Sequence, residues 1–367
     1  MTEKILGQDG WISFGHIFCC YPCYKIIGGV VIRHLTDRKQ WVDILKGIGI
    51  ICVVIGHTIP GYPKAFVYLF HMPLFFFLSG QLFRPGAHAG AYFQKGIRRL
   101  LVPYACFLLL FYIPTLVAYV SPITAYNALG LAGRFVFGGP LLFGIEGTFW
   151  FATCLFATQQ ACNILISRPQ WKLLACLAAL AIAAYANQSF APHRHVPLAL
   201  NVTLAAAPLF CIGFALRRFE PRNGCLYLCA AVSLCSMWAA TRLPLSWDMK
   251  NTNYGIPILS VLVALAWFLL LSRLAKTLSR MPYISRILGS IGRVSLGIMF
   301  THQIVQIALE DLFGISSPWP RCLIALMLSY ALSQAFDRFD ITRVLLLGGD
   351  RRRVPANAPL TDRPVTA

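Results

Sequence analysis

Long apolar runs constrain the fold of this chain more than any other feature. Hydrophobic residues make up 57% of its 367 residues and charged residues only 12%, whereas about 25% of the residues in a soluble chain are charged. Each run spans about 20 residues, which is the length that an α-helix needs to cross a bilayer. The sequence therefore predicts an all-α, polytopic integral membrane protein: a helical bundle with about ten transmembrane helices.

Turn-forming residues separate the apolar runs and set the expected helix boundaries. Pro60, Gly61 and Pro63, for example, lie between the first two runs and favour a turn there. The expected helices are residues 41–60, 64–83, 100–120, 148–166, 171–188, 196–215, 224–241, 255–273, 290–313 and 318–337.

The charges between the runs predict how the bundle is oriented. If the segment before the first helix is cytoplasmic, the cytoplasmic segments hold 23 of the 32 Lys and Arg residues. The outer segments hold only 6, namely Lys64, Arg134, Arg194, Arg242, Lys250 and Arg321. Because positive residues gather on the cytoplasmic side of membrane proteins, we expect both termini in the cytoplasm.

The net charge of +19 does not indicate nucleic-acid binding. The basic residues lie in short loops, and the chain has neither zinc-finger spacing nor a basic helix with interleaved aromatic residues. We expect membrane lipid around the bundle and no nucleic acid as a partner.

The two ends of the chain are expected to lie outside the bundle. The predicted parts are an N-terminal cytoplasmic or interfacial segment at 1–37, the transmembrane domain at 38–340 and a basic cytoplasmic tail at 341–367. Residues 11–32 are fairly apolar but contain Pro22 and Lys25, which favours an interfacial segment over an eleventh span. The cluster Cys19, Cys20 and Cys23 could carry a lipid or a metal, and the sequence does not choose between these.

The first expected helix carries three ionisable residues, Asp43, Lys46 and His57. Such residues are costly inside a bilayer, so each is a candidate functional residue. Lys46 and His57 lie about 20° apart around the helix and about 16 Å apart along it, and Asp43 lies within about 60° of both. One helix face thus carries all three. The alternatives are an Asp43–Lys46 pair at the membrane edge and, for His57, a neutral ring packed on a neighbouring helix.

Two more histidines lie in the outer halves of later helices. His71 and His57 are separated by a short turn, so they can meet at similar depth in a helical hairpin. Pro73 frees backbone groups close to His71, which is tolerated beside a cavity or a neighbouring helix. His302 lies in the ninth helix, after Ser295. Simple packing stays open as an alternative role for His71.

Three histidines could also indicate a metal, but no acidic or cysteine ligand accompanies them at a known spacing. No metal is therefore expected. Glu146, just before Trp150, and the pair Glu310 and Asp311 are candidate carboxylates for orienting a histidine. A location at the protein surface would explain these carboxylates equally well.

A basic cluster formed by Lys95, Arg98 and Arg99 precedes Pro103 at the start of the third helix. It contributes to the positive charge on the cytoplasmic side. Because arginine makes bidentate contacts to phosphate, the cluster could also hold the phosphates of a cytoplasmic donor.

Several short motifs carry a resemblance to a known family. They are Trp41-Val-Asp43 with Lys46-Gly-Ile-Gly-Ile, Gly56-His57, Phe70-His71-Met72-Pro73-Leu-Phe-Phe-Phe-Leu-Ser-Gly80, Arg99-Leu-Leu-Val-Pro103-Tyr104, Phe149-Trp150-Phe151 and Ser295 through His302. These motifs resemble the acyltransferase family 3 membrane proteins, particularly the branch similar to fucose O-acetylases and nodulation O-acetyltransferases. The Lys46 to His57 spacing is the most specific of them, and the resemblance covers about 38–340.

The resemblance implies a ten-helix enzyme in the bacterial inner (plasma) membrane. This enzyme would move an acetyl group from cytoplasmic acetyl-CoA to a sugar hydroxyl of a glycolipid, a surface polysaccharide or a nodulation-type lipo-chitooligosaccharide. The implied roles are catalysis for His57 and His71, contact with CoA for Lys46, Lys95, Arg98 and Arg99, and support for Asp43, Trp150, Ser295 and His302. Two positions depart from the family pattern: Lys95 stands where many members carry arginine, and Met299 stands where tyrosine is common.

The alternative from another functional class is a secondary transporter or proton-coupled permease that uses the same buried charges as a relay. Transporters more often show repeated halves with a symmetric pair of broken helices. Here the distinctive residues lie in the first two helices and the ninth, without such symmetry.

Overall fold

The structure is a computed structural model, and it describes residues 25–27, 30–32, 37–85, 89–192, 194 and 196–351. The chain divides into two compact units, Met1–Lys39 and Gln40–Ala367. In the first unit, β1 (Lys25–Ile27) pairs antiparallel with β2 (Val30–Ile32). The predictions for the cysteine cluster at 19–23, for most of 11–32 and for the end of the tail lie outside the described residues.

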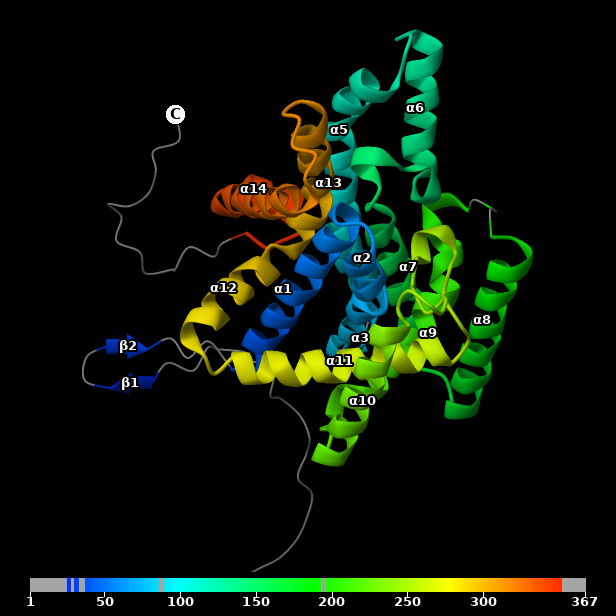
Figure 1. The fold of residues 1–367 in the computed structure, drawn as a ribbon, viewed down its shortest axis with the longest axis vertical. Helices are drawn as coiled ribbons and strands as arrows, with labels where there is room; N and C mark the ends of the chain where they lie inside the picture. Colours follow the sequence, from blue (N-terminus) through cyan, green and yellow to red (C-terminus); the bar gives the residue numbers. More distant parts are fainter. Residues whose placement is uncertain are drawn as a thin grey trace, which may run out of the picture. The chain divides into compact units, whose positions relative to one another are not determined.

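The second unit is helical, and Figure 1 shows its helices in sequence colours. The α-helices are α1 (Asp37–Thr58), α2 (Tyr62–Val67), α3 (His71–Leu82), α4 (Ala89–Gly96), α5 (Val102–Tyr119), α6 (Ala125–Phe137), α7 (Trp150–Leu165), α8 (Gln170–Phe190), α9 (Thr203–Ala215), α10 (Asn223–Ala239), α11 (Leu259–Leu278), α12 (Pro282–Arg293), α13 (Ser295–Asp311), α14 (Pro318–Arg338) and α15 (Asp340–Leu347). Short π or 3-10 helices are η1 (Ile97–Leu101), η2 (Gly139–Leu141), η3 (Gly144–Glu146), η4 (Pro197–Val202), η5 (Leu216–Arg218) and η6 (Met249–Asn251).

Within the described residues, 6 helices are long and apolar enough to cross a membrane. They are Gln40–Thr58, Tyr62–Leu82, Gly90–Tyr119, Gln170–Phe190, Pro197–Arg218 and Leu259–Leu278. The expected fourth, seventh and ninth spans correspond to shorter helices, because α7 has 16 residues and α10 and α13 have 17 each. The all-helical membrane architecture is confirmed, and the number of ten spans stays a prediction.

Helix α8 shows why a lipid surrounding is needed. Trp171, Leu174, Ile182 and Phe190 on this helix are all more than half exposed. So many large apolar side chains on one exposed helix would favour aggregation in water. Facing hydrocarbon, these apolar side chains carry no such cost. The helix also satisfies its own backbone hydrogen bonds, as a membrane span must.

The structure adds a local feature to the expected helices and loops at three places, each for a local reason. The second expected helix breaks after Val67, because Pro73 cannot continue the hydrogen-bond pattern of α3 backwards. The ninth expected helix is two helices that meet at Val294, whose φ of −104° and ψ of 17° are not helical. The expected outer loop at 121–147 contains α6, which Thr124 caps by accepting a hydrogen bond from the Asn127 backbone at 3.2 Å. In addition, α15 follows α14 directly and packs on α5 and α14.

Glycines allow two helix pairs to pack closely. Gly80 of α3 lies against the backbone of Phe210, and Gly213 of α9 lies against the backbone of Phe77, so α3 and α9 run side by side (Figure 1). Gly292 of α12 meets the Asp43 carbonyl of α1 in the same way. Small residues at such crossings allow the close backbone approach that holds membrane helices together.

A stability prediction follows for the α1–α12 crossing. A Cβ at Gly292 would overlap the Asp43 carbonyl oxygen, whereas a Cβ at Gly133 in α6 would meet nothing within 4 Å. We expect Gly292→Ala to destabilise the purified protein by roughly 1–3 kcal/mol through overpacking. Gly133→Ala should leave stability unchanged or raise it by up to about 1 kcal/mol. Thermal unfolding in detergent measures both, and equal midpoints for the two variants would contradict this packing.

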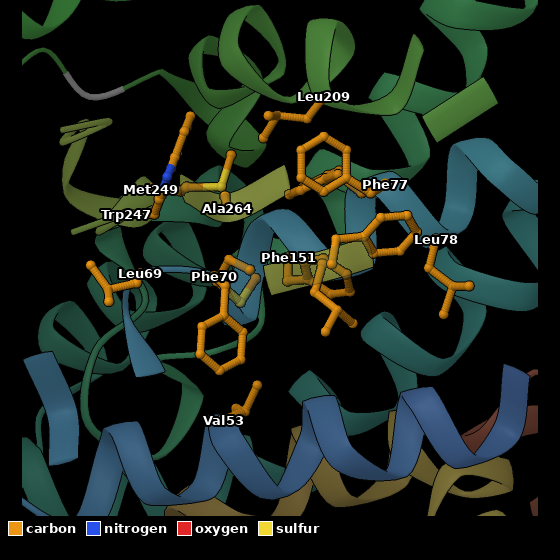
Figure 2. Packing of buried hydrophobic residues seen from close by; sticks show 14 of the residues in the cluster. Val53, Leu69, Phe70, Phe77, Leu78, Phe151, Leu209, Trp247, Met249 and Ala264 are labelled. Atoms are coloured by element: carbon orange, nitrogen blue, oxygen red, sulfur yellow. The ribbon is translucent and has the colours of Figure 1, made fainter. Parts of the chain in front are cut away.

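The largest hydrophobic cluster joins α1, α3, α7, α9, α11 and the segment 245–254. Figure 2 shows ten of its labelled members, among them Val53, Phe77, Phe151, Leu209 and Trp247, packing around one centre. Trp247 and Met249 come from an irregular segment rather than from a long helix. This packing anchors that segment to the ends of α1 and α3, where the candidate site lies.

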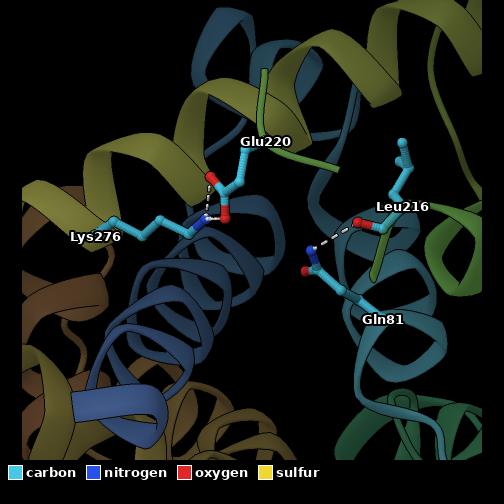
Figure 3. Close-up of polar contacts among 4 residues, drawn as sticks. All are labelled: Gln81, Leu216, Glu220 and Lys276. Atoms are coloured by element: carbon cyan, nitrogen blue, oxygen red, sulfur yellow. Dashed lines mark hydrogen bonds and ion pairs between the residues drawn. The ribbon is translucent and has the colours of Figure 1, made fainter. Parts of the chain in front are cut away.

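Polar contacts tie α3 and α11 to the segment 216–220, which follows α9 (Figure 3). Lys276 of α11 forms an ion pair with Glu220 at 2.7 Å, and Gln81 of α3 donates to the Leu216 carbonyl at 3.5 Å. The Lys276 amine also lies 5.4 Å from the centre of the Trp41 ring at the start of α1. This contact ties the start of α1 to the same end of the bundle.

Candidate active site

A cavity of about 340 Å³ lies where α1, the α2–α3 break, α7, α13 and the segment 247–251 meet. His57, His71 and Trp150 all line it. The two histidines meet there, as the sequence analysis expected, and Trp150 joins them from a distant part of the sequence. Ligand pockets typically have volumes of about 300–1,000 Å³, so this cavity suits a small ligand such as one sugar unit.

His57 reaches the cavity from the last turn of α1, which ends at Thr58. Gly56 precedes it, and a Cβ there would lie only 3.0–3.1 Å from side-chain atoms of Tyr68 and Val67. The glycine therefore lets the α2 segment pack directly against the end of α1. No hydrogen bond joins His57 to another described residue, so both ring nitrogens are available to a ligand or to a ring nearby.

His71 is held by the helix break that Pro73 causes. Its Nδ1 lies 2.9 Å from the Val67 carbonyl. Because a carbonyl only accepts, Nδ1 carries the proton and donates it, which leaves Nε2 as the basic nitrogen of the neutral ring. The His71 ring is 2% exposed and lies 4.7 Å from the Tyr68 ring, centre to centre. His71 is therefore a fixed ring with an unprotonated nitrogen at the cavity.

The same break positions a segment that sequence reasoning missed. The Tyr68 carbonyl has no helical partner and accepts a hydrogen bond from the Trp247 backbone at 2.8 Å. This bond docks the following residues, so that Asp248, Lys250 and Asn251 line the cavity. The segment has no helical or strand periodicity, so its sequence carried no signal for these residues.

Lys250 is the most enclosed cation at the cavity. Its amine donates to the Leu142 carbonyl. Burial lowers the pKa of Lys250 below its ordinary value, and the negative charges of Asp248 and Glu146 partly offset this effect. Asp248 itself accepts a hydrogen bond from the Asn251 side chain at 2.9 Å.

The ring of His302, in α13, lies next to the ring of His57. The two ring centres are 5.5 Å apart, and His302 is fully buried. Its Nδ1 lies 2.9 Å from the Ile298 carbonyl and therefore donates to it. Its Nε2 has no hydrogen-bond partner among the described residues, so this nitrogen is free to accept a bond from the His57 ring.

The candidate carboxylates do not orient the histidines. Backbone carbonyls hold His71 and His302, whereas Glu146 accepts from the Thr115 hydroxyl and Glu310 pairs with Arg321. Glu146 is fully buried rather than on the surface, and burial raises its pKa above the ordinary value. In both histidines the Nδ1–H group donates to a backbone carbonyl one helical turn earlier. The positions of acidic residues in the sequence do not indicate such a bond.

The residues expected on the donor side lie elsewhere. Lys46 forms an ion pair with Asp43 at 3.7 Å, as the alternative from the sequence proposed. Lys95 is in α4, Arg98 and Arg99 are in the π-helical η1, and Arg99 pairs with Asp350 at 3.3 Å. None of these residues lines the 340 Å³ cavity. Ser295 begins α13, about two turns before His302. The donor roles and the supporting role of Ser295 stay predictions.

A family model described as an acyltransferase domain matches residues 39–338. The chain belongs to acyltransferase family 3. The match covers every residue of the cavity and all the motifs that carried the resemblance. Neither a curated protein nor a solved structure matches the chain, so the match does not extend to the fucose or nodulation branch. Met299, where members of acyltransferase family 3 often carry tyrosine, lines the cavity.

Among the described residues, no group of three or more His, Cys, Asp or Glu side chains is arranged to hold a metal ion.

Membership of acyltransferase family 3 favours group transfer over the transporter alternative, and the cavity offers imidazole nitrogens with which an acceptor hydroxyl can be activated.

Proposed function

We propose that the protein transfers an acetyl group from acetyl-CoA to a sugar hydroxyl in the 340 Å³ cavity. The observation that carries this proposal is the convergence of His57 and His71 on one small cavity within a family of acyltransferases. Aromatic rings of Trp150, Trp247 and Phe143 line the same cavity and provide flat apolar surfaces for a sugar ring.

In the proposed step, an imidazole nitrogen of His57 removes the proton from the acceptor hydroxyl. The hydroxyl oxygen then forms a bond to the thioester carbonyl carbon, and the bond from that carbon to sulfur breaks. The imidazolium returns its proton to the departing thiolate of CoA, which leaves an acetyl ester on the sugar. A positioned general base of this kind typically accelerates a reaction by about 10²–10⁴-fold.

His302 has the geometry to orient His57 for this step. A ring N–H of His57 can donate to His302 Nε2, which has no other described partner. That bond would fix the tautomer of His57 and turn its other nitrogen towards the acceptor, as the third member of a catalytic triad does. His71 would hold the acceptor hydroxyl with its unprotonated Nε2.

The acetyl-CoA donor is proposed to bind on the cytoplasmic side, through Lys46 and the cluster Lys95, Arg98 and Arg99. The rise of about 16 Å between Lys46 and His57 on α1 would then be spanned by the extended arm of CoA. The acceptor is proposed to be a glycolipid, surface polysaccharide or lipo-chitooligosaccharide, as in the branch with fucose and nodulation O-acetyltransferases, and the location to be the bacterial inner membrane.

CoA release tests the proposed activity against the transporter alternative. Membranes containing the protein should release free CoA from acetyl-CoA when an extract of cell-surface glycans is added. Membranes containing His57→Gln should release CoA at the rate of membranes without the protein. Uptake of a solute without any CoA release would contradict the proposed transferase.

A topology prediction accompanies the proposal of ten spans with cytoplasmic termini. Its basis is the excess of 23 over 6 basic residues among the 32 of the chain. Reporter fusions after Ala367 and within 121–147, which contains α6, should report opposite sides of the membrane. If both fusions report the same side, the ten-span arrangement is wrong.

A further inference from the structure

Hydrogen-bond donors converge on one side of the cavity. A Cβ at Gly147 would lie 3.8 Å from the Lys250 amine and 3.8 Å from Nε2 of Gln303, so both nitrogens approach the same point. Gln306 donates to Oε1 of Gln303, which leaves the Gln303 amide nitrogen as a donor towards the cavity. Lys250 donates one of its protons to Leu142 and has others to offer.

The cavity also has an excess of positive charge. Lys64 and Lys250 line it together with one carboxylate, Asp248, whose oxygen already accepts from Asn251. Neither lysine forms an ion pair with another described residue. An oxyanion binds favourably beside a partly buried cation that has no ion-pair partner, particularly when a second hydrogen-bond donor is close by.

The proposed chemistry gives a second reason for a negative charge here. Both lysines line the same cavity as His57. When His57 takes a proton from the acceptor hydroxyl, a third positive charge appears beside them. A negative group on the acceptor would offset this repulsion, because opposite charges within about 4–6 Å stabilise each other's charged form.

We propose that the cavity takes a sugar that carries an oxyanion group, either a carboxylate or a phosphate, and that Lys250 and Lys64 hold this group. Gln303 donates to the same group, and the sugar ring lies against the aromatic wall with its hydroxyl towards His57. This assignment rests on the proposed transferase function for the reaction, but the binding that it predicts is measurable without any acetyl-CoA.

Tryptophan fluorescence or thermal unfolding in detergent tests the assignment, since Trp150 and Trp247 line the cavity. The probes are methyl β-glucoside, methyl β-glucuronide and glucose 6-phosphate. The native protein should bind at least one charged sugar about tenfold or more tightly than the neutral glucoside, as expected for a charge-assisted contact. The charged sugar that binds more tightly identifies the group as carboxylate or phosphate.

Four variants localise the effect. Lys250→Gln and the exposed Lys64→Gln should each weaken binding of the charged sugar several-fold and leave binding of the glucoside unchanged. Arg242→Gln is the matched control, because Arg242 carries the same charge in an outer segment but stacks on Trp238 at 4.4 Å outside the cavity. Lys250→Arg keeps the charge and should retain the preference.

Equal affinity of the native protein for charged and neutral sugars would overturn the assignment. Unchanged affinity of both glutamine variants for the charged sugar would also overturn it. So would displacement of that sugar by CoA, because the lysines would then bind the donor rather than the acceptor. A charged-sugar preference that depends on Lys250, in a protein that releases no CoA from acetyl-CoA, would instead support this site and contradict the proposed transferase.

Discussion

Replacement of His57 by glutamine is expected to slow acetyl transfer at least about 10²-fold while the protein still inserts in the membrane and binds acetyl-CoA. Glutamine keeps a polar side chain of similar reach but accepts no proton near neutral pH. A histidine that only packs would tolerate this change with a modest loss of stability. The measurement is turnover of purified enzyme, with donor binding and thermal unfolding followed on the same sample.

His302→Gln separates positioning from packing in the same experiment. If His302 orients His57, its loss should lower kcat and change the pH profile of the reaction while KM for the donor stays the same. His71→Gln should raise KM for the acceptor, because its unprotonated Nε2 faces the cavity. More than half of native turnover in His57→Gln would remove the catalytic assignment.

Replacement of both Arg98 and Arg99 by alanine is expected to raise KM for acetyl-CoA tenfold or more. Charge-assisted contacts to phosphate each contribute about 1.5–3 kcal/mol, so the loss of two such contacts exceeds one factor of ten. The existing partner of Arg99 is Asp350, in a pair with side chains 51% and 79% exposed. Such exposed pairs contribute little to stability, so the folded protein should persist.

The matched control for this pair is Arg217→Ala with Arg218→Ala. These two residues are also adjacent arginines at the end of a membrane helix, in η5, and on the side predicted to be cytoplasmic. Their loss removes the same charge from the topology signal, so KM for acetyl-CoA should stay at the native value. A KM that rises equally in both double variants, or in neither, would reduce the Arg98 cluster to a topology signal.

The sequence was sufficient to predict the parts of the site that lie on long helices. The short turn at Gly61 predicted that His57 and His71 can meet, and both line the cavity. Lys46, which the 3.6-residue period places on the same face of α1 as His57, does not line it. The structure adds that Pro73 splits the second helix and so fixes His71 through Val67. The proline was visible in the sequence, but the acceptor that its break would find was not.

Two of the missed residues come from a segment without periodicity. Lys250 and Asp248 are placed by a hydrogen bond from Trp247 to the Tyr68 carbonyl, which joins positions that are far apart in sequence. Gln303 was overlooked because an uncharged amide on a membrane helix does not by itself indicate a binding site. Only its neighbours in the structure suggest a role for it. The break between α12 and α13 falls at Val294 without proline or glycine at that position, so tertiary packing overrides the local preference there.

The packing of glycines illustrates the same limit. Gly47, Gly80, Gly213 and Gly292 read in the sequence as ordinary small residues of apolar runs. Only the structure shows that each one meets the backbone of another helix. Contact between two helices depends on which of their faces meet, and the sequence of one helix alone does not specify this.

Mass spectrometry of surface and secreted glycans tests the central claim most directly. Cells that express the native protein should carry glycans heavier by one acetyl group than those of cells without it. Cells that express His57→Gln at the same level should match the cells without the protein. Glycans that are identical in all three cell types, or acetylation that persists with His57→Gln, would contradict the account of an acetyltransferase that uses His57.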